Sequence, residues 1–187
     1  MLAYIRIARP DHWFKNVFVL PGTAVALLLG GGKFQDIWGD LLLVLLVTSL
    51  AASANYTLNE LLDAESDKHH PSKRQRPIPM GLVSVPLAVL QYIILAFVSL
   101  AMAYLLGNFI LSTIAVFLVL GLAYNVPPIR TKDRVYLDVI SESANNAVRL
   151  VLGWAARNSG HFVGIHDFER AIASPLQIAS VVNPLCS

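Results

Sequence analysis

Charge is scarce and unevenly distributed in this sequence. Only 14% of its 187 residues are Asp, Glu, Lys or Arg, against roughly a quarter in soluble domains, and 56% are hydrophobic. The net charge of +2 is too small to indicate a polyanionic partner such as a nucleic acid, and the apolar composition excludes a disordered chain. The single cysteine, Cys186, excludes an intramolecular disulfide and a cysteine-based metal site.

The longest gap in the charge pattern runs over 53 residues, from Pro77 to Ile129, which contain no Asp, Glu, Lys, Arg or His. A membrane span needs only about 20 apolar residues, so this stretch is long enough for two. Its middle, Leu106-Gly107-Asn108, is typical of a tight turn. We therefore predict spans over Leu82–Leu105 and Phe109–Tyr124.

Two further uncharged stretches, Asn16–Gly32 and Leu41–Leu58, predict two spans upstream of that pair. Four spans put the N-terminus, segment 60–76 and segment 130–134 on one side, which then carries ten Lys or Arg residues. The loops on the other side hold only Lys33. The positive-inside rule then predicts that the basic side is cytoplasmic. The four spans predict an integral protein of the cell membrane.

A fifth helix is predicted over Tyr136–Ala156, where polar residues recur at helical spacing on one face of an otherwise apolar segment. Such a stripe should face a bundle interior or a wet cavity, although a helix lying on the membrane surface is the alternative. The fold expected over residues 1–156 is an all-α polytopic membrane bundle of about five transmembrane helices, followed by an atypical tail over 157–187. The stripe comprises Asp138, Glu142, Asn145 and Arg149.

The first polar cluster follows the second span, where Asn59, Asp63 and Asp67 are spaced by four residues. If the helix continues through them, they lie on one face, with neighbouring Cβ atoms about 6 Å apart. Two carboxylates so close repel each other unless a cation neutralises them. Mg²⁺ favours carboxylate oxygens and completes its shell with water and substrate phosphates. The pattern predicts a magnesium site, with the exposed His69-His70 pair and Glu65 outside it.

Basic residues follow this cluster and recur after the fourth span. Arg and Lys suit phosphate contacts, and a Tyr hydroxyl can donate to a phosphate oxygen, so the two segments together predict a diphosphate site at the membrane surface. The alternatives are a solvated charged loop, a topology signal, or an anchor for anionic lipid. The residues concerned are Lys73, Arg74, Arg76, Tyr124, Arg130 and Lys132.

The residues in these clusters resemble the motifs of the UbiA superfamily of intramembrane prenyltransferases. The run from Asn59 through Asp67 is similar to the family's first aspartate-rich motif, and Tyr124 to Lys132 resembles its Tyr/Lys motif. The segment Arg9-Pro10-x-x-Trp13-x-Lys15-Asn16 is similar to the branch that includes decaprenyl-phosphate phosphoribosyltransferases. The resemblance covers about residues 5–155.

The resemblance implies a helical bundle around a cavity, with Mg²⁺ held by Asp63 and Asp67, assisted by Asn59, on a prenyl diphosphate. It implies that the protein is embedded in the lipid bilayer, which is its partner. It also implies that the prenyl group is transferred from the diphosphate to an acceptor in the cavity. In the phosphoribosyl branch the same site would hold phosphoribosyl diphosphate, and a polyprenyl phosphate would attack the sugar. The remaining roles implied are phosphate binding by Lys73, Arg74, Arg76, Arg130 and Lys132, assisted by Tyr124.

The family has about twice as many helices as this sequence predicts, and a second aspartate-rich motif that is not found here. The chain therefore resembles an N-terminal half of the family joined to an unrelated tail. Two other functions stay open at this point. One is an ion transporter using the acidic residues and the polar fifth helix, although that function favours charges near the middle of spans. The other is an inactive fragment.

Overall fold

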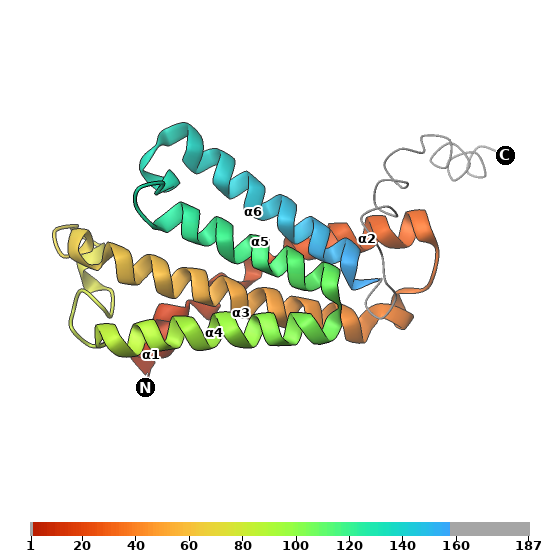
Figure 1. The fold of residues 1–187 in the computed structure, drawn as a ribbon, viewed down its shortest axis with the longest axis horizontal. Helices are drawn as coiled ribbons and strands as arrows, with labels where there is room; N and C mark the ends of the chain where they lie inside the picture. Colours follow the sequence, from red (N-terminus) through yellow and green to blue (C-terminus); the bar gives the residue numbers. More distant parts are fainter. Residues whose placement is uncertain (1, 158–187) are drawn as a thin grey trace.

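The computed structural model describes residues 2–157, and within that range the chain forms helices and no strand (Figure 1). This confirms the predicted all-α class. The predicted atypical tail lies, apart from Arg157, outside the described residues. The elements are α1 (Leu2–Ala8), η1 (Pro10–Phe18, a 3-10 helix), α2 (Val19–Gly30), α3 (Phe34–Asp67), η2 (Lys73–Gln75), α4 (Val85–Leu106), α5 (Asn108–Asn125), η3 (Thr131–Asp133) and α6 (Val135–Ala156).

Four segments of the described chain are long and apolar enough to cross a membrane: Leu2–Gly30, Phe34–Asp67, Val85–Leu106 and Asn108–Asn125. They correspond to the four predicted spans. The first one is less regular than predicted, because Pro10 starts a 3-10 helix that precedes α2. Helix α6 corresponds to the predicted fifth helix, and it is not among these four segments.

Helix α3 is much longer than the predicted span, because it starts at Phe34 and continues through the polar cluster to Asp67. The first part of α3 packs into the main apolar core through fully buried Val44, Val47 and Ala51. Its last turns extend beyond this core and carry the acidic residues. The expected continuation of the helix through the cluster is therefore confirmed.

The connections between helices gather the polar segments at one end of the bundle. Gly107, at φ 130°, makes the tight turn between α4 and α5, as predicted. The α3–α4 loop and the α5–α6 loop consequently lie together at the opposite end, on the left of Figure 1. These two loops (residues 68–84 and 126–134) define what we call the basic end of the bundle.

Helices α2 and α6 pack against each other at two glycines. A Cβ atom on Gly153 would lie 1.8 Å from the carbonyl oxygen of Val19, and one on Gly22 would lie 1.9 Å from that of Leu150. The Thr23 hydroxyl donates to the carbonyl oxygen of Gly153 at 2.9 Å. This close approach orients α6, so that its polar face turns toward α3 and α5.

Candidate functional site

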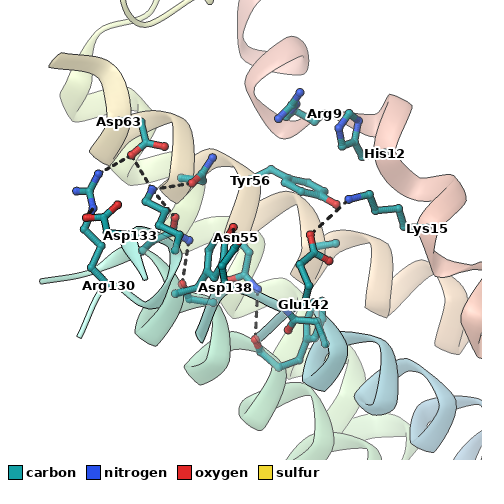
Figure 2. A pocket seen from close by; sticks show the side chains of 18 of the residues that line it. Arg9, His12, Lys15, Asn55, Tyr56, Asp63, Arg130, Asp133, Asp138 and Glu142 are labelled. Atoms are coloured by element: carbon teal, nitrogen blue, oxygen red, sulfur yellow. Dashed lines mark hydrogen bonds and ion pairs between the residues drawn. The ribbon is translucent and has the colours of Figure 1, made fainter. Parts of the chain in front are cut away.

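A cavity of about 470 Å³ opens at the basic end of the bundle. Its walls come from η1, from the second half of α3, from α5 and α6, and from both loops (Figure 2). The apolar residues that line it are few: Ala52, Phe117 and Gly121, beside two tyrosines. Polar and charged side chains form the remainder of the wall.

The three residues of the predicted magnesium cluster, Asn59, Asp63 and Asp67, all line this cavity. They project from successive turns of α3, as their spacing of four predicts. The side chain of Asp63 is 13% exposed and that of Asp67 is 4% exposed. Both carboxylates therefore require cationic partners in their buried surroundings.

Lys132 is the principal partner of this cluster. Its Nζ donates to Oδ1 of Asp63 at 2.6 Å, to Oδ1 of Asn59 at 2.9 Å and to Oδ1 of Asn125 at 3.0 Å. These three bonds use all three ammonium protons. Burial lowers the pKa of Lys132 from its ordinary value, and the hydrogen bond and charge of Asp63 oppose that shift. The α5–α6 loop is thus joined to α3 by a half-buried ion pair.

Two arginines complete the pairing of the carboxylates. Nη2 of Arg130 donates to Oδ1 of Asp63 at 3.0 Å, and its Nε lies 2.8 Å from Oδ2 of Asp133. Nη1 of Arg76 donates to Oδ2 of Asp67 at 2.5 Å. Each acidic residue of the α3 cluster is therefore matched by a basic residue from a different loop.

Some of the other predicted site residues line the cavity and others do not. Lys73 lines the cavity, whereas Arg74 is exposed and does not. Tyr124 lines it too, but its hydroxyl donates to Oδ1 of Asp138 at 2.8 Å. As predicted, Glu65 lies outside: its side chain is 80% exposed and pairs with Lys68 at 2.7 Å. His69 and His70 are also exposed.

The polar stripe of α6 faces the cavity, and all four of its predicted members line it. The alternative of a helix lying on the membrane surface is wrong, since Arg149 is buried and donates from Nε to Oδ1 of Asn16 at 3.0 Å. Among the described residues, the buried Oδ1 atoms of Asn55 and Asn145 have no hydrogen-bond donor. These two oxygens can accept hydrogen bonds from a ligand.

A family model described as the UbiA prenyltransferase family matches residues 19–186. The chain belongs to this family. Decaprenyl-phosphate phosphoribosyltransferase of Mycobacterium tuberculosis is 34% identical over 81% of this chain and 50% of its own length. Protoheme IX farnesyltransferase of Korarchaeum cryptofilum is 31% identical over 76% of this chain and 47% of its own. The chain thus spans about half the length of these curated relatives.

A solved UbiA homolog from Archaeoglobus fulgidus, whose structure was determined with GPP and Mg²⁺, is similar in fold. The TM-score is 0.65 at 25% sequence identity, and the match covers 90% of this chain and 58% of the other. The predicted resemblance to the family, and the partial helical bundle it implied, are therefore confirmed.

The oxygen ligands that this UbiA-family site offers meet some of the requirements of a divalent cation. Two carboxylates and one amide offer hard oxygen atoms from one helix face, which is the chemistry that Mg²⁺ prefers. The hydrogen bonds of the structure use Oδ1 of Asp63 and Oδ2 of Asp67, which leaves the other oxygen of each carboxylate for a metal. No group of three His, Cys, Asp or Glu side chains suited to a metal occurs in residues 2–157.

Residues from the N-terminal segment are the part of the site that sequence reasoning missed. Arg9, His12 and Lys15 line the cavity together with Tyr56 of α3. The guanidinium of Arg9 lies 5.8 Å from the Tyr56 ring centre, and the His12 ring contacts the same ring edge-on at 5.3 Å. Nζ of Lys15 lies 3.8 Å from Oε1 of Glu142 (Figure 2).

Two hydrogen bonds fix this N-terminal segment against α3. Nε1 of Trp13 donates to the Ser53 hydroxyl at 2.9 Å, and Nδ2 of Asn16 donates to that of Ser49 at 2.8 Å. The available signal was the close spacing of Arg, Trp, Lys and Asn in residues 9–16. The sequence pattern alone gave no way to place that segment beside α3.

Proposed function

We propose that this chain forms the magnesium- and diphosphate-binding part of an integral-membrane transferase, which moves a prenyl group from an isoprenoid diphosphate to an acceptor. The observation that carries the proposal is the meeting of Asn59, Asp63 and Asp67 with the basic residues of two loops in one cavity. The chain spans about half of its curated relatives, so the activity is assigned to the whole protein. We place the site on the cytoplasmic side of the cell membrane, because the loops around it are basic.

Asp63 and Asp67, with Asn59 beside them, would hold Mg²⁺. The bound ion would neutralise the diphosphate and lower the barrier to its departure. Lys132 and Arg130, which pair with Oδ1 of Asp63, would lie beside the bound ion and would contact phosphate oxygens of the ligand.

The basic residues act on the leaving diphosphate. Two loops supply the basic residues that would contact the diphosphate: Lys132 and Arg130 from one, and Arg76 and Lys73 from the other. Their charges stabilise the negative charge that grows as the allylic C–O bond breaks. Tyr124 donates to Asp138 and holds that carboxylate at the wall of the cavity. The prenyl group, electron-poor as the bond breaks, is then captured by a nucleophile of the acceptor.

A second donor, phosphoribosyl diphosphate, is favoured by the composition of the cavity wall. An isoprenoid chain needs apolar walls, whereas this part of the cavity offers few apolar side chains and the unpartnered oxygens of Asn55 and Asn145. Sugar hydroxyls would donate to those oxygens. The name of the Mycobacterium tuberculosis relative, a decaprenyl-phosphate phosphoribosyltransferase, supports the same choice. The acceptor would then be a polyprenyl phosphate.

Calorimetric titration of the detergent-purified chain tests the diphosphate site. Inorganic diphosphate should bind in the presence of Mg²⁺ and lose at least about 100-fold in affinity in the Asp63→Asn/Asp67→Asn variant, since the cation loses both charged ligands. Glu65→Gln is the matched control, because it removes a carboxylate of the same helix that lies outside the cavity. Equal binding by the wild type and the double variant would overturn the proposal.

The choice of donor is tested with a variant of the polar wall. Asn145→Ala should weaken the binding of phosphoribosyl diphosphate by roughly tenfold, because a hydroxyl of the sugar loses its acceptor. Geranyl diphosphate, which has no hydroxyl, should bind the variant as it binds the wild type. A variant that loses both ligands equally, or neither, contradicts the assignment of a sugar diphosphate.

A further inference from the structure

A second cavity, of about 630 Å³, lies on the outer side of the basic end, between the N-terminal segment and the α3–α4 loop. Helix α1 forms one wall, held in place by fully buried Ile7, which packs with Ile78 and Val83 of the loop. Residues 72–77 form the facing wall. The cavity is therefore built by contacts that the diphosphate site does not use.

Positive charge dominates this second cavity. Its basic residues are Arg6, Arg9, Lys73 and Arg76. Its two acidic residues are already engaged, since Asp11 bonds His12 at 2.7 Å and Oε1 of buried Glu60 accepts from the amide of Ile78 at 3.4 Å.

Three of the four basic side chains have no acidic partner. Arg76 is paired with Asp67, but within residues 2–157 no carboxylate lies within 4.0 Å of the charged atoms of Arg6, Arg9 or Lys73. Arg9 also adopts a left-handed backbone conformation, φ 49° and ψ 56°, which a non-glycine residue adopts only at a cost in energy. Three cations that form no direct ion pair around one cavity favour an anionic ligand.

Part of the lining of the same cavity is apolar, and we call this part its rim. Ile5, 57% exposed, lines it together with Pro10 and Pro77, and neighbouring Leu2 is 78% exposed on the same short helix. In the predicted topology α1 begins at the surface of the membrane, so this rim faces the region where lipid headgroups meet acyl chains. A ligand that is anionic at one end and apolar at the other fits both features.

We propose that this second cavity binds the phosphate group of a membrane lipid. Arg6, Arg9 and Lys73 would contact the phosphate oxygens, since arginine offers a two-pronged contact and lysine a compact charge. The lipid chain would leave past Ile5 into the bilayer.

The two cavities are adjacent, because Arg9, Lys73 and Arg76 line both of them. A lipid phosphate in the second cavity would therefore lie next to a diphosphate in the first, with shared basic residues between the two anions. Of the proposed phosphate contacts, Arg6 alone belongs only to the second cavity, so lipid binding that depends on Arg6 can be measured whether or not the proposed transfer reaction is correct.

Native mass spectrometry of the full chain in a neutral detergent tests the lipid site. The probes are dioleoyl phosphatidic acid, an isoprenoid monophosphate, inorganic phosphate and, as a lipid without net charge, phosphatidylcholine. Arg6→Gln changes a residue that lines only the second cavity. Arg134→Gln is the matched control, because Arg134 is exposed at the same end of the bundle and lines neither cavity.

We expect the two lipid phosphates to bind more tightly than phosphatidylcholine, and Arg6→Gln to weaken them about tenfold while Arg134→Gln does not. The double variant Arg6→Gln/Arg9→Gln should abolish the preference, with an unchanged helical spectrum as evidence of folding. Equal effects of Arg6→Gln and Arg134→Gln would overturn the site. Inorganic phosphate that binds as tightly as the lipids would overturn the assignment of a lipid.

Failure of this inference is distinguishable from failure of the proposed function. The Asp63→Asn/Asp67→Asn variant should keep its lipid binding while losing magnesium-dependent diphosphate binding. If that variant loses both, the two cavities form one site and the second one is not independent. If Arg6→Gln weakens lipid binding and the Asp63→Asn/Asp67→Asn variant does not, the lipid site is supported whether or not the transferase assignment is correct.

Discussion

The two ends of the bundle are built on different principles. At the end away from the loops, α2 and α6 touch through glycines and α3 fills the core with Val44 and Val47. At the basic end, the same α3 carries Asp63 and Asp67, and loops rather than helices supply their partners. One helix thus packs in the core through its first part and positions Asp63 and Asp67 through its last turns, where they do not contribute to that core. The difference predicts that stability and ligand binding respond to separate substitutions.

The largest expected effect is on stability and comes from the packing end. Gly153→Ala places a Cβ atom 1.8 Å from the Val19 carbonyl oxygen and 2.9 Å from the Thr23 amide nitrogen, so α2 and α6 must separate. We expect a loss of about 3 kcal/mol in the free energy of unfolding, typical of severe overpacking. Thermal unfolding followed by circular dichroism measures it.

Gly39→Ala is the control for this substitution. It lies in α3 with nothing within 4 Å of the added Cβ, so it should leave the melting temperature unchanged or raise it. If Gly153→Ala melts at the same temperature as Gly39→Ala, the tight α2–α6 contact is not a determinant of the fold.

At the basic end, Lys132→Gln should lower the affinity for Mg²⁺-diphosphate about tenfold, because a charged contact to phosphate is lost. Calorimetry under the conditions used for the wild type measures this. Lys33→Gln removes the same charge on the opposite side of the bundle and should have no effect. An unchanged affinity in Lys132→Gln would mean that Lys132 serves only to pair Asp63.

A smaller effect is expected from Tyr124→Phe, which removes the 2.8 Å hydrogen bond to Asp138 and leaves the ring in place. Loss of one such bond should reduce the affinity for the sugar or prenyl diphosphate by about threefold. The same titration detects it, with Tyr136→Phe, whose side chain is exposed, as the control. A loss of 100-fold would instead indicate direct contact between Tyr124 and the diphosphate.

The smallest effect should come from Lys68→Gln. Lys68 pairs with Glu65 on the solvent side of α3, outside the cavity, although it is close in sequence to Asp67. Neither the melting temperature nor the diphosphate affinity should change, because exposed ion pairs contribute little. A clear loss of affinity would show that the basic end acts through its overall charge rather than through particular contacts.

Much of the fold could be predicted from the distribution of charge. The uncharged stretches located four spans, and the Gly107 turn fixed the hairpin that brings both loops to one end. The start of the first span was less accurate, because the charged residues before Asn16 interrupt the apolar pattern although the chain is already helical there. The start of α3 at Phe34 lies outside the predicted span Leu41–Leu58, whereas its continuation to Asp67 was expected from the spacing of the acidic cluster.

The candidate site was predictable where its residues share one helix. Periodicity of four placed Asn59, Asp63 and Asp67 on one face, and the polar stripe of α6 was assigned correctly to an interior face. Pairings across the fold were not predictable. The approach of Arg9 and Lys15 to the cavity, and of Lys132 to Asp63, depends on tertiary packing that spacing does not encode.

We propose above that the acidic face of α3 binds a divalent cation together with a diphosphate. Electron paramagnetic resonance with Mn²⁺ in place of Mg²⁺ tests it most directly, because protein-bound Mn²⁺ loses the sharp signal of the free ion. With inorganic diphosphate present, the wild type should bind about one Mn²⁺ per chain, as one acidic face predicts, and Asp63→Asn should bind far less. Equal binding by both proteins, each folded, would contradict a cation site on the acidic face of α3.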